Sequence, residues 1–334
     1  MTTRPAALQT PLVDRFGRRH TYLRVSLTDR CNFRCVYCMP EHGVEWKPRA
    51  EILTLEEIER LVRLFAQLGV TKVRLTGGEP TVRRGFLGLV ESIAAIPGIE
   101  RVLLTTNGTR LADFAPKMAA AGMKGLNISL DSLRRQRFHE ITRRDALDEV
   151  LAGVEASMKA GLDTKINVVV IPGVNDDEIL DFVGFASQRP IQVRFIEFMP
   201  FLGNEWKPDR VFGYREMLDV ISPKFEVEPI SRTPSDVAKE FRIGGGLGTL
   251  GFITSMTESF CSDCNRIRLT ADGHFKTCLF LPERTSLRDM MRDGADDEQL
   301  ARLIHADLQS KWAEHPPMHE WRQLDHLTMV QIGG

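Results

Sequence analysis

The feature that most constrains the fold of this chain is an alternation of short β-rich runs with amphipathic helical stretches, from about residue 22 to residue 200. The apolar pattern predicts six strands, at 22–27, 72–77, 101–106, 125–130, 165–171 and 192–198. Strands that alternate with helices are typical of parallel sheets with right-handed crossovers. About six units predict an α/β fold with an incomplete (βα)6 barrel, and a doubly wound open sheet is the alternative. Either architecture places functional side chains at the carboxyl ends of strands.

The first helical stretch shows its period most clearly. Thr54 and Glu57 fit a capping box at its start, and Gly69 ends it. Between them, apolar residues follow at helical spacing: Ile58, Leu61, Val62, Phe65 and Leu68.

The pattern changes after residue 200. Helices are predicted near 214–221, 286–293 and 296–313, and the Gly-rich run 243–255 carries short β-like segments. We therefore predict a barrel domain over residues 1–220 and a smaller C-terminal region over residues 221–334 that packs on it.

Composition excludes several classes of protein. Of the 334 residues, 43% are hydrophobic and 27% are charged, so the chain has enough apolar side chains for a large core. The net charge of -1 gives no reason to expect a nucleic-acid partner. The sequence contains neither an apolar run long enough to cross a bilayer nor the apolar core of a secretory signal, so we expect a cytoplasmic protein with no membrane partner.

The cysteines fall into two triplets, which favours metal binding over disulfides in a reducing compartment. Thiolates are preferred by zinc and by iron–sulfur clusters. A structural zinc site closes with a fourth ligand, for which His42 and His274 are candidates, whereas a 4Fe-4S cluster with three cysteines would leave one iron open. Spacing alone leaves both readings possible. The first triplet consists of Cys31, Cys35 and Cys38, and the second of Cys261, Cys264 and Cys278.

Two motifs resemble those of the radical S-adenosylmethionine (SAM) enzymes. The first is Cys31-x3-Cys35-x2-Cys38, which directly follows the first predicted strand, and the second is GGEP at 77–80, which ends the second strand. The resemblance implies a partial βα barrel and a 4Fe-4S cluster on the first triplet, whose open iron binds SAM and generates a 5'-deoxyadenosyl radical. Glycines let backbone approach a ligand closely. SAM contacts are expected from Tyr37, Gly77, Gly78, Glu79, Ser129 and Met199.

The C-terminal triplet, together with CNRIRLTADG at 264–273, resembles one branch of this superfamily, the GTP 3',8-cyclases. The resemblance runs from about residue 14 to the C-terminus. It implies a second 4Fe-4S cluster on Cys261, Cys264 and Cys278, whose open iron binds GTP. The implied reaction is the first step of molybdenum cofactor biosynthesis, in which the radical takes the C3' hydrogen of GTP and the product is 3',8-cyclo-7,8-dihydro-GTP.

A triphosphate needs cations, and the chain places several on predicted strands. Arg266 and Arg268 share one face of an extended segment, as do Lys72 and Arg74. Lys165 lies at the start of its strand, so its use requires the C-terminal region to fold over that end. Contacts to GTP are expected from Arg24, Lys72, Arg74, Thr105, Lys165, Arg194, Arg266, Ile267 and Arg268.

Catalysis is expected to involve the first triplet, Arg266, Arg268 and the terminal Gly333 and Gly334, which resemble a tail that reaches into the active site. The partners expected are GTP, a reductant protein of unknown identity and a functional link to cyclic pyranopterin monophosphate synthase. Oligomeric state is left open, with a homodimer as one option. The alternatives are a radical SAM enzyme that modifies a peptide, a zinc-binding RNA-interaction protein and a two-cluster electron carrier.

Overall fold

The computed structural model describes residues 10–40, 42–231, 236–282, 285–317, 320 and 328–333. Their strands form one sheet of eleven strands in the order β11-β10-β1-β2-β3-β4-β5-β6-β9-β8-β7. The strands are β1 (Tyr22–Ser26), β2 (Lys72–Thr76), β3 (Arg101–Thr106), β4 (Met123–Ser129), β5 (Asp163–Val170), β6 (Gln192–Glu197), β7 (Val227–Pro229), β8 (Lys239–Ile243), β9 (Thr249–Ile253), β10 (Arg266–Leu269) and β11 (Phe275–Lys276).

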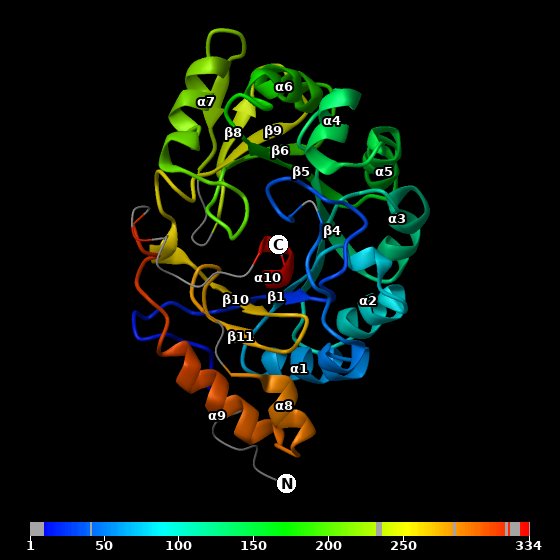
Figure 1. Cartoon of the computed structure of the whole chain (residues 1–334), viewed down its shortest axis with the longest axis vertical. Coiled ribbons are helices and arrows are strands. Elements are labelled where there is room, and N and C mark those ends of the chain that lie inside the picture. Colours follow the sequence, from blue (N-terminus) through cyan, green and yellow to red (C-terminus); the bar gives the residue numbers. More distant parts are fainter. Residues whose placement is uncertain are drawn as a thin grey trace.

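Strands β1 to β6 are parallel and lie side by side in sequence order. This confirms the six predicted strands, with ends that differ by at most two residues. A doubly wound sheet would reverse its strand order at a switch point, and no reversal occurs between β1 and β6. The sheet curves into an incomplete barrel with the helices outside it (Figure 1).

The helices connect successive strands and cover the outer face of the sheet. The capping box predicted at Thr54 and Glu57 is present at the start of α1. The helices are α1 (Leu55–Gln67), α2 (Phe86–Ala94), α3 (Leu111–Ala120), α4 (Arg135–Thr142), α5 (Leu147–Lys159), α6 (Ile179–Ser187), α7 (Tyr214–Ile221), α8 (Leu287–Arg292), α9 (Asp297–Leu308) and α10 (Met329–Ile332). Short 3-10 helices are η2 (Arg49–Glu51), η3 (Pro80–Val82), η4 (Asp176–Glu178), η5 (Pro208–Arg210) and η6 (Cys261–Asp263).

One predicted helix is too long. The helix expected at 296–313 ends at Leu308, because the chain turns there and Lys311 N–H donates to the Leu308 carbonyl at 3.1 Å. The turn directs Lys311 into the protein, where its side chain is 3% exposed.

The C-terminal strands extend both edges of the parallel sheet. β10 pairs with β1 and β9 pairs with β6, each in parallel, while β8 and β11 add antiparallel neighbours. The register places Arg268 beside Arg24, and Arg24 beside Arg74. A division of the chain at residue 220 therefore remains a prediction, because strands from both sides of that residue share one sheet.

The apolar core fills the space between the sheet and the outer helices. It includes Phe65 of α1 and Phe275 of β11, which are both fully buried. Within the described residues, no helix is both long and apolar enough to cross a membrane.

Candidate active site between two cysteine triplets

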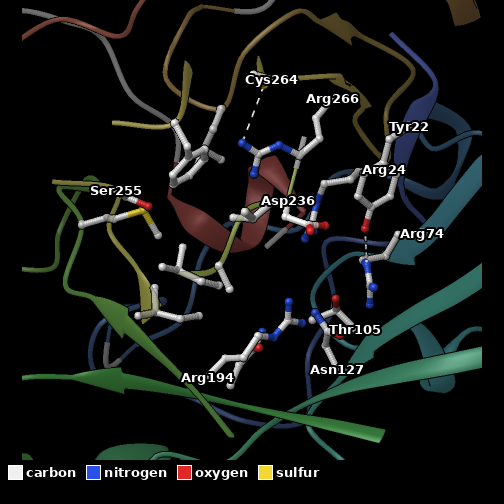
Figure 2. A pocket seen from close by; sticks show the side chains of 18 of the residues that line it. Tyr22, Arg24, Arg74, Thr105, Asn127, Arg194, Asp236, Ser255, Cys264 and Arg266 are labelled. Carbon is white, nitrogen blue, oxygen red and sulfur yellow. Dashed lines mark hydrogen bonds between the residues drawn. The ribbon is translucent and has the colours of Figure 1, made fainter. Parts of the chain in front are cut away.

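A cavity of about 330 Å³ occupies the inside of the barrel. Its lining runs along the strands, from Lys72 and Asp163 near their starts to Ser129 and Val169 near their ends. Figure 2 shows that arginines from β1, β2, β6 and β10 surround this space. The cavity therefore extends along the strands from their starts to their ends, and residues at strand starts can take part in the site.

The first triplet lies on the loop that follows β1. Backbone bonds anchor this loop to the end of α4, from Arg34 N–H to the Thr142 carbonyl at 3.0 Å and from Val36 N–H to the Ile141 carbonyl at 2.9 Å. The N–H of Cys38 donates to the carbonyl of Cys35 at 3.0 Å. The loop thus brings three thiols together at the carboxyl end of β1.

The pKa values of these thiols reflect burial and their closeness to one another. Burial raises the pKa of Cys31 to about 11. Burial and the charge of Cys31 together raise the pKa of Cys38 to about 12. Burial, followed by the charges of Cys38 and Asp131, raises the pKa of Cys35 well above its ordinary value. Soft-metal ligation would remove the three protons, so this donor set suits an iron–sulfur cluster.

The glycine pair of GGEP packs against the chain itself. A Cβ on Gly78 would lie 2.3 Å from the Arg30 carbonyl oxygen, and one on Gly77 would lie 2.6 Å from that of Thr28. This close approach lets Gly78 N–H donate to the Thr28 carbonyl at 2.7 Å and Glu79 N–H to the Arg30 carbonyl at 2.8 Å. The pair therefore fixes the segment that leads into Cys31, and because neither glycine lines the cavity, their expected contacts with SAM stay predictions.

Glu79 is fully buried, and its carboxylate accepts hydrogen bonds from neighbouring segments of the chain. Its carboxylate accepts from Thr81 N–H at 3.0 Å, Thr106 Oγ1 at 2.8 Å and Asn107 N–H at 2.7 Å. These donors hold GGEP against the end of β3. The carboxylate is not part of the cavity lining, so its expected contact with SAM stays a prediction.

Three of the residues expected to contact SAM line the cavity, namely Tyr37, Ser129 and Met199. The Tyr37 hydroxyl donates to Asp131 Oδ2 at 2.7 Å, and the other carboxylate oxygen of Asp131 accepts from Val169 N–H at 2.8 Å. Asp131 was missed by the sequence analysis. Its signal was its position two residues after Ser129, on the same side of the chain as it leaves β4.

The cations expected to bind GTP meet on one side of the cavity. Arg24, Arg74, Arg266 and Arg268 line it from β1, β2 and β10, because the register sets these strands side by side. Tyr22, which the sequence analysis missed, accepts a hydrogen bond from Arg74 Nε at 2.5 Å (Figure 2).

Burial changes the pKa values of this cationic group. Burial alone would raise the pKa of Tyr22, but the charges of Arg74, Arg24 and Lys72 lower this pKa to about 7. Burial, together with the charge of Arg74, lowers the pKa of Arg194 to about 10. Like charges buried together cost free energy unless an anion neutralises them, so this arrangement suits an anionic ligand.

Several buried polar atoms of the cavity have no hydrogen-bond partner among the described residues. They include Nε and Nη2 of Arg194, Oγ1 of Thr105 and Oδ1 of Asn167. Native proteins seldom leave such atoms unpaired, so each marks a position where a ligand or water completes the site. Arg194 and Thr105 are among the residues expected to contact GTP, whereas Asn167 was missed.

The remaining substrate residues occupy different positions. Lys72 and Lys165 line the cavity near the strand starts, the same end at which Cys264 precedes β10, because β10 runs parallel to β1 and starts beside Tyr22. Ile267 is fully buried in the core, so a ligand could reach only its backbone.

The second triplet lines the cavity through Cys261, Cys264 and Cys278, whereas the loop of the first triplet lines it through Tyr37. Arg266 Nη2 donates to Cys264 Sγ at 3.6 Å, as Figure 2 shows. Burial alone would raise the pKa of Cys264, but the charges of Arg266 and Lys311 lower this pKa to about 6. In the described part of the chain, no three His, Cys, Asp or Glu side chains are grouped to hold a single metal ion.

The C-terminal tail enters the barrel. A Cβ on Gly333, whose φ is +86°, would lie 2.5 Å from Ser26 Cβ and 3.1 Å from Thr76 Oγ1, at the ends of β1 and β2. The preceding α10 lies near the centre of the ring of strands (Figure 1) and packs against residues of both triplets. Gly334 lies outside the described residues.

Two family models match the chain: the radical SAM superfamily over residues 25–186 and Molybdenum Cofactor Synthesis C over residues 191–317. A crystal structure of SuiB from Streptococcus suis bound to S-adenosylmethionine shares the fold, with a TM-score of 0.58 at 16% identity over 90% of this chain and 68% of that one. The incomplete barrel and these matches make the chain a radical SAM protein. This class implies SAM and a 4Fe-4S cluster as cofactors.

Curated relatives identify the branch. The chain is 46% identical to GTP 3',8-cyclase of Rhodopirellula baltica over 97% of this chain and 92% of the relative. It is also 46% identical to the mitochondrial GTP 3',8-cyclase of Arabidopsis thaliana, over 97% of this chain and 83% of the relative. The chain therefore belongs to the GTP 3',8-cyclase family.

Other relatives are longer than this chain. Molybdenum cofactor biosynthesis protein 1 of Drosophila melanogaster is 49% identical over 92% of this chain, which spans only 54% of that protein.

Proposed function

We propose that this chain converts GTP to 3',8-cyclo-7,8-dihydro-GTP, the first step of molybdenum cofactor biosynthesis. The observation that carries the proposal is one cavity lined both by the second triplet and by Tyr37 of the first-triplet loop, with two buried Arg194 nitrogens that have no hydrogen-bond partner among the described residues. With SAM bound, a cluster on the first triplet would supply a 5'-deoxyadenosyl radical, and the C3' hydrogen of GTP is the atom that it would take.

The chain's own residues bind and orient the two ligands. Cys31, Cys35 and Cys38 hold the first cluster, and Tyr37, Ser129 and Met199 line the part of the cavity assigned to SAM. Asp131 fixes the ring of Tyr37 through its hydroxyl. Gly77, Gly78 and Glu79 keep the loop before the first triplet in place. These contacts set the direction from which SAM meets the substrate.

The second triplet holds a second 4Fe-4S cluster that binds GTP, and the arginines of β1, β2, β6 and β10 neutralise the triphosphate. Of these arginines, Arg266 and Arg268 lie closest in sequence to the second triplet. They contribute both to the surroundings of the second cluster and to neutralising the triphosphate. Gly333 packs so closely at the strand ends that a side chain would clash with Ser26 there. The tail helps to exclude water from the site. Exclusion of water and exact orientation are what radical chemistry requires from the protein.

The proposal includes further expectations. A reductant protein delivers electrons, and cyclic pyranopterin monophosphate synthase is a functional neighbour. A cytoplasmic location stays a prediction, since the name of the Arabidopsis relative assigns that protein to mitochondria.

Anaerobic reconstitution with iron and sulfide tests the function. We expect about eight irons per chain, four for each cluster. With SAM, GTP and a strong reductant, the protein should form 5'-deoxyadenosine and cyclised GTP in parallel. Zinc as the native metal, or deoxyadenosine formation that is indifferent to GTP, would overturn the proposal.

A further inference from the structure

The thiols of the second triplet come from two separate pieces of chain. Cys261 begins η6 and Cys264 follows its end, and the Cys264 N–H donates to the Cys261 carbonyl at 3.1 Å. Cys278 lies beyond the β10–β11 hairpin. The antiparallel pairing of β10 with β11 brings the two pieces near each other, and further contacts fix the segments that carry the thiols.

Lys311 joins the two pieces. Its ammonium group donates to the Arg266 carbonyl at 2.9 Å and to the Thr277 carbonyl at 2.5 Å, and lies 3.8 Å from Cys264 Sγ. Thr277 directly precedes Cys278. Lysine is rarely buried, and burying its charge is costly unless all its donors are used. At 3% exposure, Lys311 uses its three donors on these three partners.

Arg18, near the opposite end of the chain, holds the backbone of Cys261, the remaining cysteine of the triplet. Its Nη1 donates to the Cys261 carbonyl at 2.7 Å and to the Ala313 carbonyl at 2.7 Å, while Nη2 donates to the Trp312 carbonyl at 2.6 Å. The segment after α9 that carries Lys311 is thereby tied to Cys261 as well. Every part of the second triplet is therefore connected to residues 311–313.

Arg18 is itself held in position. Its Nε donates to Asp14 Oδ2 at 2.7 Å, and Asp14 also accepts from the backbone N–H groups of Phe16 and Arg18. His20 lies 3.1 Å from the same carboxylate. The Asp14 side chain is completely buried, so the guanidinium is preorganised rather than recruited on metal binding.

We propose that Lys311 and Arg18 are positioning residues that preassemble the second triplet, and that the charge of Lys311 raises the reduction potential of the cluster bound there. This inference rests on the proposed function, because it takes an iron–sulfur cluster as the group held by the triplet. Reduction adds a negative charge to a cluster, and a cation close to a ligand sulfur stabilises that state. Arg18 touches carbonyl groups, so it fixes geometry with less effect on potential.

The test isolates the second cluster in the full-length chain with Cys31→Ser, Cys35→Ser and Cys38→Ser. This parent is reconstituted anaerobically with iron and sulfide, and the readouts are iron per chain, the spectrum of the reduced cluster by electron paramagnetic resonance, and its midpoint potential. Lys311→Met should weaken iron binding about 10-fold or more and lower the potential. Lys311→Arg should restore both, because it retains charge and donors.

Arg18→Met should weaken iron binding while leaving the potential near that of the parent. Arg302→Met is the matched control, since Arg302 lies on α9 with its side chain 64% exposed and should change neither quantity. If the parent binds a cluster and Lys311→Met matches it in iron affinity and potential, the positioning role is wrong and the proposed function stands. If the parent binds no cluster, the second cluster and the positioning role fail together.

Discussion

The two cysteine triplets are assembled in different ways. The first lies within one loop, and its position depends on backbone bonds to the end of α4 and on the close packing of Gly77 and Gly78 beside it. The second draws its thiols from both sides of a hairpin, and side chains distant in sequence, Arg18 and Lys311, connect them. One site is specified locally and the other by tertiary structure.

The electrostatic surroundings also differ. Asp131 contributes to the raised pKa of Cys35, whereas Arg266 and Lys311 lower that of Cys264. SAM carries a sulfonium cation and GTP a triphosphate anion. The acidic environment of the first triplet and the cationic one of the second therefore match the ligands proposed for each.

The largest effect that separates the triplets is expected from Gly78→Ala. Its Cβ would lie 2.3 Å from the Arg30 carbonyl oxygen, a backbone atom that cannot move without displacing the segment before Cys31. We expect a loss of about 3 kcal/mol in the free energy of unfolding. Iron should be lost from the first triplet and retained by the second, as measured by iron content in the two triple-serine backgrounds.

Gly88→Ala is the control for this prediction, because nothing lies within 4 Å of its Cβ position in α2. Replacing a helical glycine by alanine should stabilise the chain slightly. A Gly78→Ala variant as stable and as rich in iron as Gly88→Ala would show that the close approach does not support the first triplet.

A second test concerns the cationic side of the cavity. Arg194→Met removes a guanidinium with two buried nitrogens that no described residue pairs. GTP affinity should fall about 10-fold or more, as expected for lost hydrogen bonds to a charged group, whereas SAM affinity stays unchanged. Because an uncompensated buried charge is removed, the ligand-free protein should melt at the same or a higher temperature.

Arg215→Met provides the comparison, since that side chain is 79% exposed and pairs with Glu258 outside the cavity. Isothermal titration with GTP and with SAM, alongside thermal melts, gives all the quantities needed. Equal loss of both ligands in Arg194→Met would remove the assignment of Arg194 to the substrate side.

The smallest expected effect involves an ion pair that links the two regions. Lys47, in the segment after the first triplet, pairs with Asp272 in the turn before Cys278. Burial alone would raise the pKa of Asp272, but hydrogen bonds from His274, Lys47 and Thr270 lower this pKa below its ordinary value. A carboxyl with a lowered folded-state pKa stabilises the fold above its unfolded pKa near 4, and this contribution is lost as pH falls further.

Asp272→Asn should therefore cost about 1 kcal/mol of unfolding free energy at pH 7, and the difference from the unmodified chain should shrink as the pH is lowered through the range of acid titration. Asp113→Asn, an exposed change on α3, should have little effect at any pH. A difference that stays constant between pH 7 and pH 3 would contradict the ionic origin of this contact. Denaturant unfolding at both pH values measures it.

The parts of the molecule that sequence could predict are those encoded locally. Strands β1 to β6 and the capping box of α1 follow from periodic patterns, and each triplet is visible as a spacing. Tyr22 and Asn167 were missed, although their alternation with Arg24 and Lys165 along the strands was a usable signal. Arg18 and Lys311 had no such signal, because their partners are carbonyl groups brought close only by the fold.

The central claim is that the triplets divide the two ligands between them, and equilibrium binding to the two reconstituted triple-serine variants tests it most directly. The chain with Cys31→Ser, Cys35→Ser and Cys38→Ser should keep GTP binding and lose SAM binding. The chain with Cys261→Ser, Cys264→Ser and Cys278→Ser should do the reverse. Retention of SAM binding by the first variant, or of full GTP affinity by the second, would contradict the account.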